Sequence, residues 1–179
     1  MDGGQPAGSS PQAGNVRAVP VDALAHPTVQ RIAALLRSLG APGEPLELPA
    51  SAPTATAAAD QLGCSVGAIA NSLLFDADSA PLLVLTSGAH RVDTHRVAGL
   101  IGAKSVGRAS ADFVRASTGM PIGGVAPLGH PVPIRTLVDL WLAEHPVVWA
   151  AAGHPHTVFP TTYGELLRLT GGTPAEVGA

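Results

Sequence analysis

Apolar residues recur every three to four positions in several short stretches of the chain, and a glycine follows most of these stretches. In the clearest one, Val29, Ile32 and Leu36 fall on one face of a helix that ends at Gly40. The same reasoning predicts short helices over residues 54–62, 93–101, 110–118, 137–142 and 162–169. A Ser, Thr or Asp begins most of them, which is typical of a helix N-cap.

Apolar runs bounded by turn residues predict strands. Residues 69–75 and 81–86 flank a turn at 76–80 and are expected to form a hairpin. In the first strand, alternation places Asn71, Leu73 and Phe75 on one face, with Ser72 and Leu74 on the other. Further extended segments are expected over residues 44–48, 104–108, 132–135 and 147–152. Short strands and helices without a strict repeat favour one α+β domain with a mixed sheet over a doubly wound parallel fold.

The chain has 179 residues, which suits one domain that buries a sizeable core. Residues 1–20 are rich in Gly, Ser, Pro and Gln and are expected to form a flexible tail. The domain is expected over residues 21–172, and a C-terminal tail over 173–179. The chain shows no secretory signal pattern at its start and no apolar run long enough to span a membrane, so a cytoplasmic protein is expected.

Charge and cysteine content exclude two further classes of protein. The formal net charge is −3, from 10 Lys and Arg against 13 Asp and Glu. This balance argues against a protein that grips nucleic acid by bulk positive charge, although it leaves room for a small contact with the end of an RNA. Cys64 is the single cysteine, which excludes an internal disulfide framework.

The segment 119–129 is the first candidate for chemistry. It contains Gly123, Gly124 and Pro127 and can be neither a helix nor a regular strand. One interpretation is an ordinary glycine turn stiffened by proline. The other is a loop whose backbone N–H groups face an oxyanion or a carbonyl. It is not a phosphate-binding loop, because no Gly-Lys-Ser/Thr follows.

Histidines are the second candidate. The pair His154 and His156 could contribute two metal ligands, but no third ligand stands at a diagnostic spacing, so no metal is expected. A loop histidine is more readily a hydrogen-bond donor or general base, or a plain surface residue. No Gly-x-Ser-x-Gly elbow surrounds Ser65, Ser72 or Ser87.

The order of several segments resembles the YbaK/prolyl-tRNA-synthetase-associated domain family, the trans-acting aminoacyl-tRNA deacylases. The matching segments are residues 69–75, 82–85, 92–104, 109–119, 121–127, 147–153 and 162–169. The resemblance covers about residues 22–172. It implies a compact α+β domain with a barrel-like mixed sheet flanked by short helices. Its pocket would receive the 3′-terminal aminoacyl-adenosine of a mischarged tRNA and hydrolyse the ester without a metal or cofactor.

The resemblance also implies roles for individual residues. Asn71 stands where the family pattern has a lysine, and it would hold the terminal nucleotide or substrate as a neutral amide. Gly124 would bind the ester carbonyl through the backbone, and His154 would be a base. The expected substrate-binding residues are Ser72, Gly123, Val125, Pro127 and Gly153. Lys104, the only lysine, is expected to be structural or on the surface.

Two functions follow from this resemblance. The first is editing in trans, with the 3′ end of a mischarged tRNA and an aminoacyl-tRNA synthetase as partners and no membrane. The replacement of the family lysine by Asn71 implies an altered activity or specificity. The alternative is a module of the same fold that binds a small amino-acid-like ligand or a protein partner without catalysis.

Overall fold

The computed structural model describes residues 22–179, so the tail expected over residues 1–20 lies outside the described residues. The described chain contains five α-helices and eight strands. The helices are α1 (Pro27–Ser38), α2 (Ala55–Leu62), α3 (Thr94–Ile101), α4 (Ala111–Thr118) and α5 (Tyr163–Thr170). The strands are β1 (Leu46–Glu47), β2 (Ile69–Ala77), β3 (Ala80–Ser87), β4 (Val106–Arg108), β5 (Arg135–Asp139), β6 (Val148–Ala151), β7 (Thr157–Thr161) and β8 (Thr173–Ala175).

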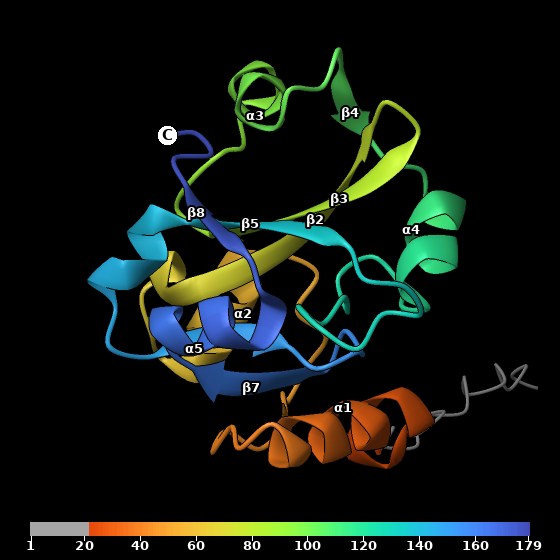
Figure 1. The fold of residues 1–179 in the computed structure, drawn as a ribbon. Helices are drawn as coiled ribbons and strands as arrows, with labels where there is room; N and C mark the ends of the chain where they lie inside the picture. Colours follow the sequence, from red (N-terminus) through yellow and green to blue (C-terminus); the bar gives the residue numbers. More distant parts are fainter. Residues whose placement is uncertain (1–21) are drawn as a thin grey trace, which may run out of the picture.

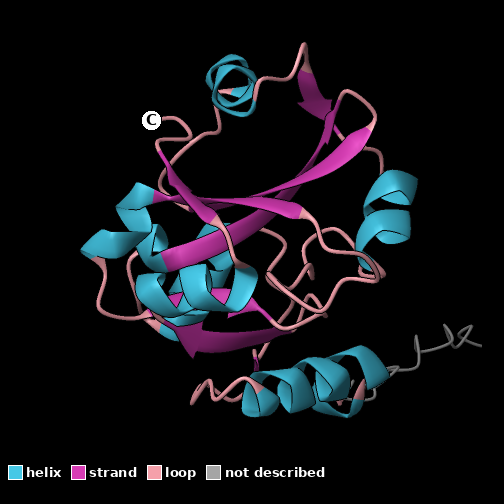
Figure 2. Cartoon of the chain, in the orientation of Figure 1, coloured by secondary structure: helices cyan, strands magenta, loops and turns pink. Residues whose placement is uncertain are grey.

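All eight strands join one mixed sheet, which confirms the α+β class. Along the sheet the order is β1-β7-β6-β2-β3-β5-β8, and β4 pairs with β2 off this path. The β2–β3, β6–β7, β1–β7 and β2–β4 pairs are antiparallel, whereas the β2–β6, β3–β5 and β5–β8 pairs are parallel. The sheet is not closed, because β1 and β8 are its two unjoined ends, so the barrel-like arrangement is not found. Helices surround the sheet, and the β2–β3 hairpin extends toward β4 (Figures 1 and 2).

Side-chain caps and glycines set the helix ends where the sequence predicted them. The hydroxyls of Thr54, Ser110 and Thr162 each accept a hydrogen bond from the backbone N–H three residues later. Glycines with left-handed backbone follow α2, α3, α4 and α5, namely Gly63, Gly102, Gly119 and Gly171. Local sequence therefore accounts for most helix boundaries.

The C-terminal third departs from the predicted elements. The helix predicted over residues 137–142 is wrong: β5 occupies Arg135–Asp139, and a 3-10 helix follows over Leu140–Glu144. Leu137 and Val138 are buried beside β3, and a short apolar run of this kind suits either a strand or a buried helix. Strand β7 was not predicted, and β8 pairs with β5 in the segment expected to be a tail.

Two clusters of buried side chains cover opposite faces of the hairpin. The larger contains Leu74 and Leu83, together with residues of α1, α4, α5 and the 120–128 loop. The smaller contains Leu82 and Val97, with Phe75 packed against it. This separation confirms the predicted alternation of β2, with Leu74 and Phe75 on different faces. Among residues 22–179, no helix is long and apolar enough to cross a bilayer.

Candidate functional site

Strand β2 is paired along its whole length on one side and only at its ends on the other. Strand β3 pairs with residues 70–77. On the opposite side, β6 pairs with Ile69 and Ala70, and β4 pairs with residues 75–77. Residues 71–74 therefore face a gap between β6 and β4. We call this stretch the open edge of β2.

The peptide groups at the open edge are directed by the antiparallel ladder. The Gly88 N–H donates to the Ile69 carbonyl at 2.8 Å, so residue 69 and every second residue after it turn their peptide groups toward β3. Ser72 and Leu74 consequently turn theirs toward the gap. A buried strand normally satisfies such groups with a neighbouring strand, so the open edge offers backbone donors and acceptors to a ligand.

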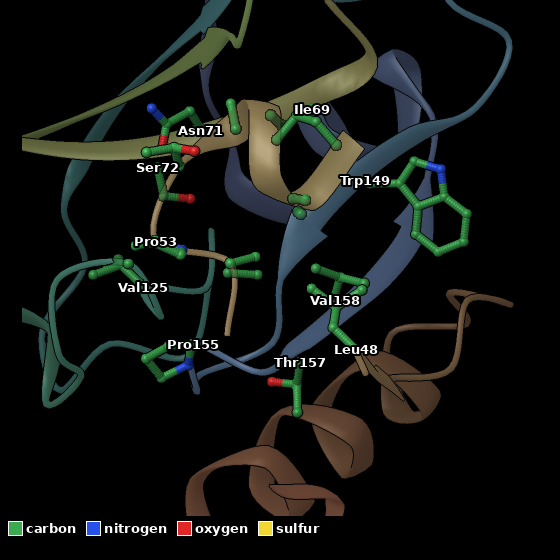
Figure 3. A pocket seen from close by; sticks show the side chains of 18 residues that line it. Leu48, Pro53, Ile69, Asn71, Ser72, Val125, Trp149, Pro155, Thr157 and Val158 are labelled. Atoms are coloured by element: carbon green, nitrogen blue, oxygen red, sulfur yellow. The ribbon is translucent and has the colours of Figure 1, made fainter. Parts of the chain in front are cut away.

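Two hollows meet at the open edge. The inner cavity has a volume of about 50 Å³, and its 18 lining residues include none that is charged at neutral pH. They come from β2, β6, β7, α2 and the flanking loops: Leu48, Ala52, Pro53, Thr54, Ala55, Ala58, Ile69, Ala70, Asn71, Ser72, Gly123, Val125, Trp149, Ala150, Ala151, Pro155, Thr157 and Val158. Figure 3 shows Asn71 and Ser72 together on one side of the inner cavity and Trp149 and Val158 on the other.

The second hollow, the outer groove, runs along β2 toward β4. Its volume is about 440 Å³, which falls in the range of small-molecule sites. Its lining residues are Pro53, Asn71, Ser72, Leu73, Leu74, Phe75, Thr94, Arg108, Ala109, Val114, Ile122, Gly123 and Val125. The two hollows share Pro53, Asn71, Ser72, Gly123 and Val125. A ligand that occupies both must pass these five residues.

Asn71 and Ser72 supply the polar side chains at this junction. Asn71 is half-buried, and its amide carries two donors and one acceptor. The Ser72 hydroxyl is buried and has no hydrogen-bond partner among residues 22–179. A buried hydroxyl without a partner costs about 1–3 kcal/mol. Both residues line the two hollows, so these are the polar side chains closest to a ligand at the junction.

The glycine-rich loop contributes one of its two adjacent glycines to the junction. Gly123 has a φ of +85° and open space where a Cβ would stand, and it lines both hollows. Gly124 is buried instead: a Cβ there would lie 2.9 Å from the His154 carbonyl carbon. Gly124 therefore allows close packing of two loops and does not line either hollow. Val125 is 3% exposed and lines both hollows.

His154, Gly153 and Pro127 also lie outside both hollows. The His154 Nδ1 accepts the His156 N–H at 3.1 Å, and the His154 ring lies 5.3 Å from that of His26. Burial and then the neighbouring His26 and His156 lower the pKa of His154, while Glu47 opposes this. The hydrogen bond to His156 stabilises the loop, and His154 does not reach the junction where a base would act.

Gly153 and Pro127 belong to the surrounding framework. Gly153 is buried against Thr28 of α1, and its φ is +102°. Pro127 lines a separate hollow with His130. The His130 Nε2 lies 2.8 Å from the Ala126 carbonyl and donates to it. This hydrogen bond stabilises the glycine-rich loop from outside the two hollows.

Sequence reasoning missed several residues of the inner cavity. Pro53 and Thr54 enter from the start of α2, while Trp149 and Thr157 come from β6 and β7. Strand β7 was not predicted because it contains Pro160, and a proline within an apolar run argues against a strand. In the structure Pro160 lies within β7, opposite Trp149 of β6. Arg108 was also missed, because its position in the outer groove depends on the pairing of β4 with β2.

The donor set of the described residues suits neutral hydrogen bonding more than metal chemistry. No group of three or more His, Cys, Asp or Glu among residues 22–179 could hold a metal ion. Burial raises the pKa of the Cys64 thiol, which packs beside α2 and lines neither hollow. The junction offers a hydroxyl, a carboxamide and backbone N–H groups, which can hold a polarised carbonyl.

Known proteins share this architecture. A solved structure described as a trans-editing enzyme for prolyl-tRNA synthetase superposes with a TM-score of 0.80 at 38% identity, covering 86% of this chain and 98% of that one. The proline–tRNA ligase of Geobacter sulfurreducens is 27% identical over 121 residues, and that of Desulfovibrio desulfuricans is 32% identical over 95 residues.

The matches to the two ligases are partial. They cover 63% and 53% of this chain but only 21% and 17% of the ligases. The sequence model of the aminoacyl-tRNA editing domain matches residues 49–169. This range contains the open edge of β2 and every residue that lines the two hollows except Leu48. The chain therefore belongs to the aminoacyl-tRNA editing domain family.

Proposed function

We propose that the protein hydrolyses the ester bond of mischarged aminoacyl-tRNA in trans, at the junction of the inner cavity and the outer groove. The observation that carries this proposal is the buried, unpartnered Ser72 hydroxyl beside Asn71 at an open strand edge, inside the region matched by the editing domain. The ester carbonyl lies at the junction, where the hydroxyl, the carboxamide and a backbone N–H can donate to it.

The chemistry needs little from ionisable side chains. Water adds to the carbonyl carbon, the carbonyl oxygen becomes an oxyanion, and the bond to the ribose oxygen breaks as that oxygen takes up a proton. Preorganised neutral donors stabilise the oxyanion, and one such donor typically contributes about 100-fold to 1000-fold in rate. The hydroxyl next to the ester on the terminal ribose orients the attacking water. Hydrolysis of this kind needs no side-chain acid or base, and the five residues that the two hollows share include none.

The inner cavity sets the class of amino acid. Its volume is about 50 Å³, about a third of the roughly 150 Å³ of an apolar cavity that binds benzene. Its lining is mostly small or apolar, and burying a charged side chain there would be costly. The substrate class is therefore a small, uncharged amino acid, and large aromatic or charged ones are excluded.

The test is a deacylation panel. Purified protein is mixed with tRNA specific for proline, chosen because the ligase relatives are prolyl enzymes, charged with alanine, serine, cysteine, phenylalanine or aspartate. Small uncharged amino acids should be released well above the buffer rate, and phenylalanine and aspartate should not. Release at the buffer rate for every amino acid and for further tRNAs would contradict the proposal.

A binding module without catalysis is the second candidate. It is favoured by the absence of any acidic, basic or histidine side chain in the lining of the inner cavity. Saturable binding of aminoacyl-tRNA without turnover in the same panel would identify it. Because the Ser72 hydroxyl and the Asn71 carboxamide are positioned donors, we favour the hydrolase.

A further inference from the structure

The glycine-rich loop (residues 119–129) reaches the junction only through its middle. Gly123 and Val125 line both hollows there. The Ala126 N–H donates to the Met120 sulfur at 3.2 Å, so the two ends of this stretch are joined to each other. A backbone with two adjacent glycines has wide conformational freedom. The place of Gly123 and Val125 at the open edge of β2 therefore depends on what holds the rest of the loop.

Two side chains hold the end of the loop that follows Val125. The Arg31 Nη1 of α1 donates to the Gly129 carbonyl at 2.6 Å. The His130 Nε2 donates to the Ala126 carbonyl at 2.8 Å. Burial lowers the pKa of His130, and the charge of Arg31 lowers it further, against the hydrogen bond to Ala126. The imidazole therefore stays neutral beside the guanidinium at neutral pH, and both donors act on one end of the loop.

Helix α1 fits closely against Gly129. The φ of Gly129 is +82°, and a Cβ there would lie 2.6 Å from the Ile32 Cδ1 and 3.2 Å from the Arg31 Nη1. Ile32 is fully buried in the larger core cluster, which fixes this face of α1. A glycine at 129 thus lets the helix approach the loop closely enough for the Arg31 hydrogen bond. Helix α1 lies outside residues 49–169, so the match to the editing domain does not include this contact.

We propose that Arg31 is a positioning residue for the hydrolysis: it holds the Gly129 end of the glycine-rich loop, and the loop then holds Gly123 at the junction. This inference rests on the proposed function. Arg31 is not among the residues that line either hollow, so it acts through the loop and not on the substrate. Its effect is on the distance between the backbone N–H groups of the loop and the ester carbonyl. A misplacement of about 1 Å at a reacting centre can cost about 100-fold in rate.

The first test compares two replacements of Arg31 in the full-length protein. Arg31→Met keeps a long side chain and a good helix former but removes the donor, whereas Arg31→Lys keeps a charged donor. Arg31→Met should lower kcat for deacylation about tenfold and leave KM within about twofold, because the loop geometry matters most in the transition state. Arg31→Lys should recover most of this loss. Arg37→Met is the matched control on the same helix: the Arg37 guanidinium bonds the Glu44 carboxylate at 3.1 Å, and its loss should leave kcat unchanged.

Amide hydrogen exchange gives a second readout that needs no turnover. The Gly124 N–H donates to the Pro121 carbonyl at 3.0 Å, and the Ala126 N–H donates to the Met120 sulfur. Both amides should exchange about tenfold faster in Arg31→Met than in the wild type, while the amides of β2 and β3 keep their rates, because only the loop opens more readily. A replacement that merely weakened the whole fold would raise the exchange of the strands as well.

The outcomes separate this inference from the proposed hydrolysis. Unchanged exchange of the loop amides in Arg31→Met, an unchanged kcat, or an equal loss of kcat in Arg37→Met would overturn the inference. If the wild type deacylates no aminoacyl-tRNA, faster exchange confined to the loop in Arg31→Met would sustain the positioning of the loop and refute the hydrolysis.

Discussion

Two polar pairs lie side by side on the β2–β3 hairpin, and they differ in whether the protein satisfies their hydrogen bonds. On β3, the Thr86 hydroxyl and the Ser87 N–H both donate to the Asp139 carboxylate, at 3.3 and 2.9 Å. On β2, Asn71 stands opposite Thr86, and the neighbouring Ser72 hydroxyl is buried without a partner. On β3 the two donors therefore share an acceptor, the Asp139 carboxylate, whereas on β2 the Ser72 hydroxyl has none among residues 22–179.

The difference separates what holds the fold from what acts on a ligand. Asp139 is fully buried and also accepts hydrogen bonds from the Trp141 N–H and the His90 ring. The donors to this carboxylate come from β3, from the loop that follows β3 and from the 3-10 helix that follows β5. The open edge of β2 has no such neighbour between β6 and β4. Two buried side-chain atoms lack a hydrogen-bond partner among residues 22–179, the Ser72 hydroxyl oxygen and the His90 Nε2, and of these two residues only Ser72 lines the hollows.

The largest effect on stability is expected from replacing the Asp139 carboxylate. Asp139→Asn replaces a buried carboxylate that has four hydrogen-bonding partners, and the amide NH2 that takes the place of one oxygen then faces an N–H donor from which it cannot accept. The free energy of unfolding, measured with urea, should fall by about 3–5 kcal/mol. Asp112→Asn, an exposed carboxylate on α4, should change it by less than about 0.5 kcal/mol. Equal stability of the two variants would show that the network is not structural.

Removal of the orphan hydroxyl should have opposite effects on stability and activity. Ser72→Ala deletes a buried polar atom that has no partner among the residues that the structure describes. The free energy of unfolding should rise by about 1 kcal/mol, while kcat for deacylation should fall about tenfold or more. Ser105→Ala is the control: it removes an exposed hydroxyl away from both hollows that does have a partner, the Asp78 carboxylate at 3.2 Å, so it should not raise stability or change kcat. A Ser72→Ala protein with full activity would show that the hydroxyl does not meet the substrate.

A lysine at position 71, where the resemblance of segments predicts one, tests the role of the open edge. Asn71→Lys adds a positive charge at the junction, where no carboxylate lines either hollow. We expect deacylation of at least one mischarged tRNA to rise about tenfold, equivalent to about 1.4 kcal/mol. A stopped single-turnover assay on the panel measures this. Lower stability without any gain in rate would indicate a site rebuilt around a neutral amide.

The smallest effect concerns pH. Burial, together with the charge of Arg31, lowers the pKa of His130 from its ordinary value of 6.5, against the hydrogen bond to Ala126. The folded protein then binds protons less readily than the unfolded chain, so this stabilisation is present above pH 6.5 and is lost as pH falls toward the lowered pKa. His130→Gln should flatten the decline of unfolding free energy below pH 6.5. An unchanged decline would assign it to other groups.

Local signals predicted much of the fold. The caps at Thr54, Ser110 and Thr162 and the following glycines fixed helix ends, because these choices depend on a few neighbouring residues. The alternation of β2 was also readable. Strand β5 was mistaken for a helix, since a short apolar run becomes a strand only through its parallel pairing with β3.

The site was predictable only in part. The resemblance of segments pointed to Asn71, Ser72, Gly123 and Val125, and these residues line both hollows, while their roles toward a substrate stay predictions. Gly124 and His154 fall outside it, because which of two adjacent glycines faces a ligand depends on how two loops pack. Arg108 carried no sequence signal, since the pairing of β4 with β2 places it.

The central claim is that β2 carries the chemistry and β3 carries the structure, and the register pair Asn71 and Thr86 tests it most directly. Unfolding free energy and kcat/KM for deacylation are measured on Asn71→Ala and Thr86→Val. Asn71→Ala should lose about 100-fold in kcat/KM and less than about 0.5 kcal/mol in stability. Thr86→Val should lose about 1 kcal/mol in stability and keep its kcat/KM within about twofold. The reverse pattern, or equal losses in both variants, would contradict the account.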